Sequence, residues 1–166
     1  MLIYHPAFDA YHCVYRMTIL TQAVRELEYS KLRILDFYLC FPSEIANIEL
    51  PNDLQMIRPI AKKAANKFRG PVSALRTFHD IEHIQNSATR LLAASDVFDT
   101  KKLEEGIISR TSRALPKEFS RTASDSSNPT GTLIDFVLTQ LSTLPLQGNG
   151  GLKQRSRLME YRYDPV

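Results

Sequence analysis

The order of apolar and polar positions predicts a helical protein built around one buried helix. Residues 30–42, SKLRILDFYLCFP, are apolar on every helical face, which is typical of a central helix with neighbours on several sides. Ser30 is suited to cap the start of this helix. Pro42 is suited to end it, because the residue before a proline avoids the α region. The segment is too short to cross a bilayer, so we expect the core helix of a small domain.

Apolar residues recur at helical spacing in further segments. They predict helices over about 8–27, 59–69, 77–95 and 133–145. Thr77 and Thr132 each stand three residues before an aspartate, a spacing that favours a capped helix start. We expect the polar residues of the helix over 77–95 on its outer face; they are Glu82, Gln85, Asn86, Thr89 and Arg90.

Residues 107–114, rich in Ile, Ser, Thr and Arg, predict a strand or a hairpin arm. Helices followed by a short basic β element are typical of the winged-helix outline, with residues 78–95 as its third helix. The fold class that we predict is mainly α. It is a small helical domain with a winged-helix-like β arm and a C-terminal docking tail.

The chain divides into a core and three C-terminal parts. We expect a helical, winged-helix-like core over 1–119 and, after it, a flexible loop over 120–132, because SRTASDSSNPTGT has almost no apolar side chains to bury. A C-terminal helix over 133–145 would pack on the core. Residues 146–166, which begin with the glycine-rich GNGG, would form a hinge and the docking tail.

The composition is typical of a globular protein, and the use of cysteine indicates the cellular compartment. An apolar share of 43% and a charged share of 23% in 166 residues exclude a wholly disordered chain. The two cysteines stand in apolar runs and form no disulfide framework, so a reducing cytosol fits best. We expect a cytoplasmic protein with neither a signal peptide nor a membrane span.

The net charge of +3 is distributed unevenly. Residues 58–70 carry five cations and no acid, and the predicted arm over 107–114 carries two further cations. These cations could meet phosphates, and the candidates are Arg58, Lys62, Lys63, Lys67, Arg69, Arg110 and Arg113. A solvated or protein-facing surface is favoured over base reading, because the third helix has an acidic first turn.

Other polar residues have structural interpretations that we favour over chemical ones. Asp36 interrupts the most apolar segment, so it needs a partner, and Arg33 or Arg16 could form the ion pair. His79 and His83 have the i, i+4 spacing of metal ligands, but no third ligand is evident. No glycine-rich phosphate loop is present. We expect no catalytic residue, metal or cofactor.

The tail alternates cations with apolar and aromatic residues over 152–163. Arginine and tyrosine are enriched as anchors of protein interfaces, which favours docking onto a partner. A last strand that packs back on the same domain explains the pattern equally well.

Three stretches resemble the middle component of bacterial three-component ABC-type conflict systems, which include the Lamassu antiviral defence family. They are YHPAFDAYHCVYRM at 4–17, KLRILDFYLCFP at 31–42 and GLKQRSRLMEYRYD at 151–164. The resemblance implies a non-enzymatic bridging subunit beside an SMC/Rad50-like ATPase and an effector such as a nuclease. This subunit would hold the effector inactive until the ATPase engages foreign or abnormal DNA, so DNA would be met through the complex.

Within these stretches we expect partner contacts at the residues that burial does not require. They are Tyr4, His5, Asp9, His12, Arg155, Arg157, Tyr161 and Tyr163. The alternative function is a stand-alone winged-helix DNA-binding regulator that acts as a dimer. A hydrolase that uses His5, Asp9 and His12 lacks an identifiable nucleophile.

Overall fold

The computed structural model describes residues 5–66, 70–117 and 128–164. Its helices and strands are, in chain order, η1 (Pro6–Phe8), α1 (Ala10–Ala23), β1 (Glu26–Glu28), α2 (Tyr29–Cys40), η2 (Pro42–Ala46), η3 (Asn52–Ile57), α3 (Arg58–Ala64), α4 (Ala74–Asp80), α5 (Glu82–Ala94), α6 (Thr100–Glu104), β2 (Ile107–Ser109), α7 (Pro129–Thr139), η5 (Leu141–Thr143) and α8 (Leu152–Ser156). The predicted class, a mainly helical domain with a β arm, is confirmed.

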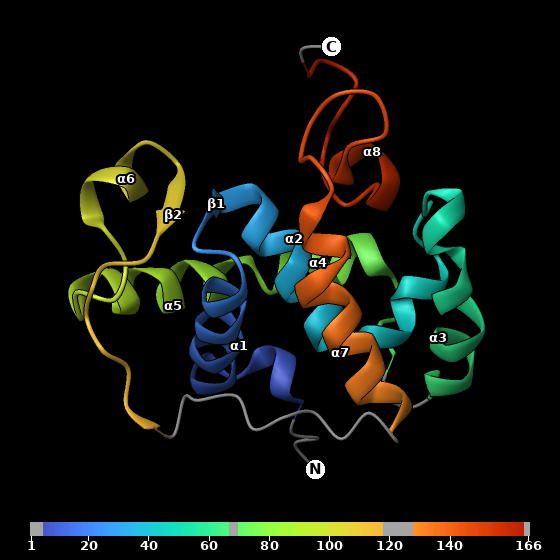
Figure 1. The fold of residues 1–166 in the computed structure, drawn as a ribbon, viewed down its shortest axis with the longest axis horizontal. Helices are drawn as coiled ribbons and strands as arrows, with labels where there is room; N and C mark the ends of the chain where they lie inside the picture. Colours follow the sequence, from blue (N-terminus) through green and yellow to red (C-terminus); the bar gives the residue numbers. More distant parts are fainter. Residues whose placement is uncertain (1–4, 67–69, 118–127, 165–166) are drawn as a thin grey trace.

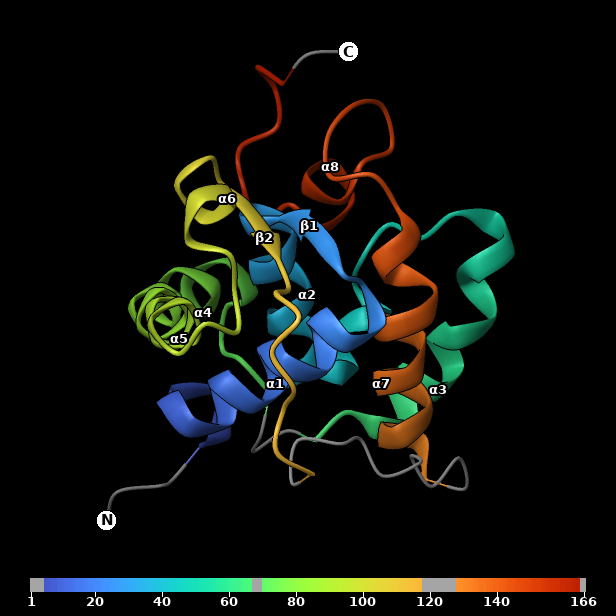
Figure 2. The ribbon, with the colours of Figure 1, turned by 60° about the vertical axis from the view of Figure 1, so that its left-hand side comes forward.

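Helix α2 lies at the centre of the fold, as its sequence predicts (Figure 1). All of its residues from Leu32 to Leu39 are buried. Figure 2 shows α5 on one side of α1 and α2, with α7 and α3 on the other side. Pro42 ends the helix as expected and opens η2, but Ser30 is not the cap, because the helix already begins at Tyr29.

The helix predicted over 8–27 is shorter in the structure. Helix α1 ends at Ala23, and residues 26–28 form strand β1 instead of a last helical turn. Leu27 is buried because it pairs across the sheet with Ile108 of β2, and not because it continues the helical stripe. Helical spacing alone could not distinguish these two ways of burying one leucine.

The β arm predicted over 107–114 is present as strand β2, but it is shorter than predicted, because the strand ends at Ser109. Strands β1 and β2 form an antiparallel pair with Glu26 opposite Ser109. On its other edge, β2 accepts a hydrogen bond at the Ser109 carbonyl from the backbone N–H of Asp99, at 2.9 Å. The arm is therefore held from both sides by segments far apart in the chain.

The helix predicted over 77–95 is divided in two. Helix α4 begins at Ala74, where the Ser73 hydroxyl caps it by accepting from the N–H of Arg76, so Thr77 is not the cap. The break lies at Ile81, whose side chain is fully buried, and α5 begins at Glu82. A local polar cap and a buried residue at the break together set these bounds.

Helix α7 also begins earlier than predicted. Asn128 accepts a hydrogen bond from the N–H of Thr130, so it replaces Thr132 as the cap. Residues 128–132, expected in the flexible loop, are thus the cap and first turn of a helix. Residues 118–127 lie outside the described part of the chain. None of the helices in the described residues is long and apolar enough to span a membrane.

A buried polar network crosses the core where α1, α2 and α5 meet. Arg16 of α1 donates from Nε to Asp36 Oδ1 at 2.6 Å, and Gln85 of α5 donates to Asp36 Oδ2 at 2.9 Å. All three side chains are buried. The predicted ion pair of Asp36 is therefore confirmed with Arg16, which leaves a charged pair satisfied inside an apolar core.

Arg33 is not the partner of Asp36. Its guanidinium donates to Gln85 Oε1 at 2.9 Å and pairs with Glu82 at 3.1 Å, and it lies 4.6 Å from the centre of the Phe78 ring. Gln85 thereby links Arg33 to the Arg16–Asp36 ion pair. This glutamine was predicted on the outer face of its helix, and that prediction is wrong, as it is for Thr89, because both are buried.

Candidate interaction surfaces

In the N-terminal motif, residues 4–17, His5 caps helix η1 and Asp9 caps helix α1. His5 Nδ1 accepts from the N–H of Ala7 at 3.1 Å, and the ring stacks on Phe41 at 5.2 Å. Asp9 caps α1 by accepting from the N–H of His12 at 3.0 Å. His12 is half-buried in the same turn, and Tyr4 lies outside the described residues. His5 and Asp9 thus stabilise local structure, and their role in partner contact stays a prediction.

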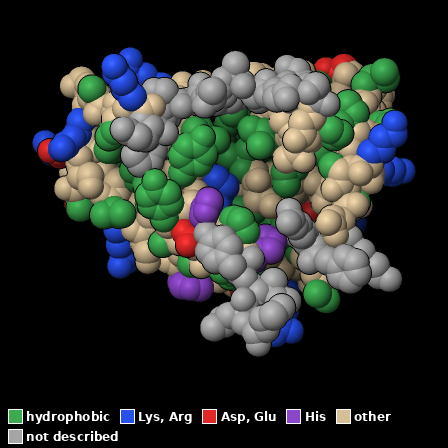
Figure 3. All heavy atoms as spheres, turned by 90° about the horizontal axis from the view of Figure 1, so that it is seen from below, with side chains coloured by type: hydrophobic (Ala, Val, Ile, Leu, Met, Phe, Trp, Pro, Cys, Tyr) green, Lys and Arg blue, Asp and Glu red, His purple; other side chains and the backbone are tan. Residues whose placement is uncertain are grey.

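An apolar groove opens beside this motif. It has a volume of about 560 Å³ and lies between α1, α5 and residues 113–116. Its exposed edges include Tyr11, 70% exposed, and Leu91, 56% exposed. Figure 3 shows hydrophobic side chains across the middle of the lower face, with most of the lysines and arginines nearer its edges. Contiguous apolar surface of this kind is typical of protein interaction sites.

The first part of the tail packs back on its own domain. Leu152 and Leu158 are buried, as in the packed-back alternative, but they lie in and just after the short helix α8 and not in a strand. Gly151 permits this return: a Cβ at that position would lie 2.5 Å from the Gln147 carbonyl oxygen. The tail therefore enters through a close backbone approach that only glycine allows.

Two predicted partner-binding arginines hold the tail to the loop before η3. Arg155 Nη1 donates to the Glu49 carbonyl at 2.7 Å, and the Glu49 N–H donates to the Arg155 carbonyl at 3.1 Å. Arg155 also bonds to the Gly150 carbonyl, and Arg157 forms an ion pair with the Glu49 carboxylate. We call Glu49, Gly150, Arg155 and Arg157 the tail clasp.

Beyond the clasp the tail becomes more exposed. Lys153 pairs with Asp164 at 2.9 Å, and both side chains are largely buried. Tyr161 is half-buried, whereas Tyr163 is 90% exposed. Of the four predicted tail residues, Tyr163 is thus the one that presents most of its side chain to a partner.

Replacing Arg155 with alanine is expected to release the tail without unfolding the domain. Side-chain hydrogen bonds from a charged group stabilise by about 1.5–3 kcal/mol each, so the amides of residues 152–158 should exchange with deuterium about tenfold faster or more. Arg162→Ala is the matched control, because Arg162 is exposed and the tail clasp does not include it. Equal exchange in both variants would show that the clasp does not hold the tail.

The described nucleic-acid candidates lie on two separate parts of the fold, helix α3 and the segment after strand β2. Arg58 is half-buried and donates to the Ile48 carbonyl at 3.0 Å. Arg110 donates to the Arg113 carbonyl, and burial, aided by nearby Arg25, lowers its pKa. Arg113 lies 3.8 Å from Asp96. Lys62 and Lys63 are exposed on α3, and Lys67 and Arg69 lie outside the described residues.

The predicted histidine pair does not form a metal site in the described residues. His79 and His83 are exposed on different helices, either side of the break at Ile81. No group of three potential His, Cys, Asp or Glu ligands comes together within residues 5–66, 70–117 and 128–164. Burial raises the pKa of the Cys13 and Cys40 thiols, and the Asp36 carboxylate adds to this shift. Thiols shifted in this direction are poor nucleophiles at neutral pH.

The N-terminal motif and the tail lie at opposite ends of the molecule. Figures 1 and 2 both place η1 and the start of α1 at the lower edge and α8 at the upper edge. The described residues of the two predicted partner sets therefore lie at opposite ends of the molecule, with the buried α2 motif between them. The sequence could suggest both surfaces, but it could not show their separation.

A family model matches nearly the whole chain. Residues 2–164 match the family model of the ABC-three component (ABC-3C) system Middle Component 5, MC5. Neither the search of curated proteins nor the search of solved structures gave a match. The matched range includes both end surfaces and the central helix, so the chain belongs to the MC5 family of ABC-3C middle components.

Proposed function

We propose that this chain is a non-enzymatic adaptor that joins two other subunits of an ABC-3C system. The family match over residues 2–164 carries this proposal, because a middle component of a multi-component system implies protein partners. The separation of the N-terminal motif from the tail supports a bridging role in particular, since one partner can dock at each end (Figure 1).

The partners that we propose are an SMC/Rad50-like ATPase and an effector such as a nuclease, as in Lamassu-type antiphage defence. The resemblance of the three motif stretches supports this choice. In this proposal the adaptor acts in the cytoplasm and holds the effector inactive until the ATPase engages DNA. Lys62 and Lys63, exposed on α3, are the candidates for any direct phosphate contact.

The burial of Gln85 weighs against a stand-alone winged-helix regulator. In such a protein the third helix reads bases with exposed polar side chains. Here Gln85 is buried and bonded to Arg33 and Asp36, and Asn86 accepts from the Tyr29 hydroxyl. Of the polar residues predicted on the outer face of the helix over 77–95, Arg90 is the exposed one.

Substitutions at the two ends are expected to remove different partners. Tyr163→Ala should weaken retention of one subunit about tenfold or more, and Tyr11→Ala should weaken retention of the other, because exposed tyrosines are frequent interface anchors. The measurement is co-purification with the tagged chain expressed from its native operon, with quantification of each subunit. Val72→Ala, at a fully exposed apolar residue outside both ends, is the control.

Three outcomes would contradict the adaptor proposal in distinct ways. If both tyrosine variants lose the same subunit, the chain does not bridge through its two ends. If neither loses any, the partner surfaces lie elsewhere. Recovery of the wild-type chain alone, as a dimer that shifts duplex DNA in a salt-dependent way, would instead support the regulator.

A further inference from the structure

The apolar groove beside the N-terminal motif has a floor and two walls. Figure 1 shows α1 and the chain after β2 descending next to each other, with α5 crossing behind them. Leu91 and Leu92 of α5 contribute to the floor, and Tyr11 of α1 and Leu115 line the walls. Leu91 is 56% exposed and Tyr11 is 70% exposed, so a ligand in the groove would cover apolar surface that now meets water.

One wall of the groove offers polar groups of the main chain. Residues 113–116 form neither a helix nor a strand, and Ala114 and Leu115 make no backbone hydrogen bond to another described residue. Backbone N–H and C=O groups need hydrogen-bonding partners when a ligand removes them from water. A polypeptide carries matching donors and acceptors, whereas a lipid tail does not, so the groove suits a peptide.

The charges around the groove are mainly positive. Arg113 is the charged residue among the described residues that line it. Lys117, directly after Pro116 of the wall, is exposed, and so is Arg90, directly before Leu91 of the floor. Helix α1, which forms the other wall, contains no acidic residue. An acidic peptide therefore complements this surface.

Two acids stand next to lining residues in the chain, and both have partners. Asp9 caps α1 by accepting from the N–H of His12 at 3.0 Å. Asp96 lies 3.8 Å from Arg113, and their side chains are 84% and 58% exposed. Exposed pairs of this kind are weak, so Arg113 can turn to a carboxylate that a partner brings into the groove.

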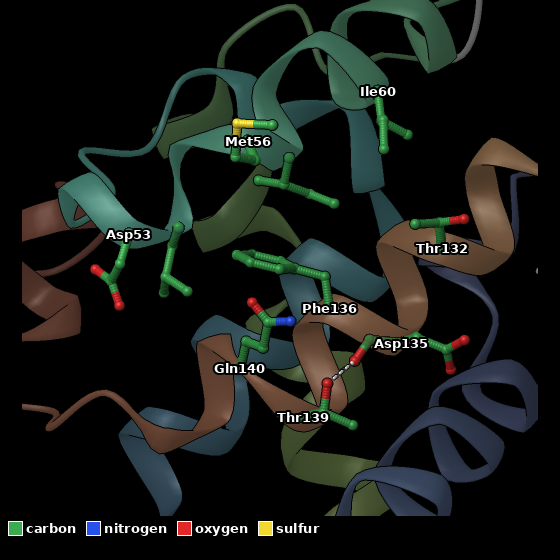
Figure 4. Close-up of a pocket in the computed structure, with 10 residues that line it drawn as sticks. Asp53, Met56, Ile60, Thr132, Asp135, Phe136, Thr139 and Gln140 are labelled. Carbon is green, nitrogen blue, oxygen red and sulfur yellow. Dashed lines mark hydrogen bonds between the residues drawn. The ribbon is translucent and has the colours of Figure 1, made fainter.

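A second hollow, between η3–α3 and α7, provides a control surface. Its volume is about 290 Å³, and Figure 4 shows the Phe136 ring extending from α7 toward the opposite wall. The chain's own side chain thus takes up part of this space. Met56, which lines the hollow and is 85% exposed, is the position that matches Leu91.

We propose that the apolar groove binds an acidic segment of a partner subunit, with apolar side chains over Leu91 and a flanking Asp or Glu facing Arg113. The inference rests on the proposed adaptor function and deepens it, because it specifies the chemistry of one partner's docking segment. Tyr11 belongs to the groove, so this partner is the subunit that Tyr11→Ala is expected to release.

A photo-cross-linking amino acid at position 91 tests which segment occupies the groove. The complex is expressed from its native operon, irradiated, and analysed by mass spectrometry. We expect a cross-link to a partner peptide in which Asp or Glu flank apolar residues. A cross-link to a second copy of this chain, to another segment of the same chain or to a basic partner peptide would overturn the proposal. So would an intact complex that gives no cross-link at this position.

Two matched pairs of variants test the affinity. Arg113→Glu is expected to weaken retention of the cross-linked partner about tenfold, more at low salt, because it places a carboxylate opposite the partner's carboxylates. Lys101→Glu makes the same charge change on exposed α6, outside the lining, and should have no effect. Leu91→Glu should also weaken retention about tenfold, whereas Met56→Glu should not. Equal losses within either pair would show that the groove does not select the partner.

The result separates this inference from the adaptor proposal. If the wild-type chain retains no subunit, the adaptor function itself is wrong. If it retains its partners and the Arg113 and Leu91 variants retain them equally well, the groove proposal alone is wrong.

Discussion

Replacement of Asp36 by alanine is expected to lower the free energy of unfolding by about 3–5 kcal/mol. The carboxylate is fully buried between the Arg16 guanidinium and the Gln85 amide. Its removal leaves the buried Arg16 cation without its counter-charge, although Arg16 still donates to the Pro6 carbonyl at 3.1 Å. The Gln85 amide loses one of its two acceptors and keeps the Arg33 carbonyl at 3.2 Å. Urea denaturation followed by circular dichroism at neutral pH measures the loss.

Two further variants show whether charge pairing is the cause. Asp36→Asn keeps the side-chain shape but removes the charge, so it should retain most of the loss if the unpaired Arg16 is responsible. Asp80→Ala breaks an exposed pair with Arg76 at 4.0 Å and should change the free energy by less than about 0.5 kcal/mol. An Asp36→Ala protein as stable as Asp80→Ala would show that the network does not stabilise the fold.

Replacement of Phe37 by alanine is expected to lower the free energy of unfolding by a similar amount, about 3–5 kcal/mol. Phe37 is fully buried on α2, and its ring contacts those of Tyr38, Phe41 and Phe78 at centroid distances of 5.4, 5.2 and 6.0 Å. The loss combines burial of the ring with the cavity left among these neighbours. Thermal and urea unfolding provide the measurement.

The expected order within a small series makes this prediction specific. Phe37→Leu keeps most of the volume and should lose less than half as much as the alanine variant. Phe8→Ala, at a half-exposed phenylalanine before α1, should have the smallest effect. If Phe8→Ala proves as harmful as Phe37→Ala, α2 is not the centre of the core.

The sequence revealed the central helix because its apolar residues cover every face. It also indicated that Asp36 pairs with an arginine, since a carboxylate in such a segment requires a cation. It could not choose between Arg16 and Arg33, because that choice depends on α5, which brings Gln85 and Glu82 to Arg33. The spacing of residues within one helix does not predict the tertiary contacts that a later helix makes with it.

Element bounds and buried polar residues were predicted less well. Leu27 fits a helical stripe yet belongs to a strand, because its partner Ile108 lies far along the chain. The polarity of Gln85 predicts a surface position, but its amide is buried and hydrogen-bonds to Arg33 and Asp36 in the core. At the candidate surfaces, the tail's alternation of cations and aromatics predicted partner contacts at Arg155 and Arg157, and that role stays a prediction. Their shared attachment to Glu49 within the chain could not be predicted without the fold.

The pairing of distant segments also sets an order of events during synthesis. Helices α1 and α2 emerge early and can join through Arg16 and Asp36, but Arg33 and the second oxygen of Asp36 lack their Gln85 partner until α5 has been made. Strand β1 waits until residues 107–109 have left the ribosome. During much of translation, the buried polar network of the nascent chain therefore lacks Gln85, and strand β1 lacks its partner. We expect the native core and the sheet to form together, late in synthesis.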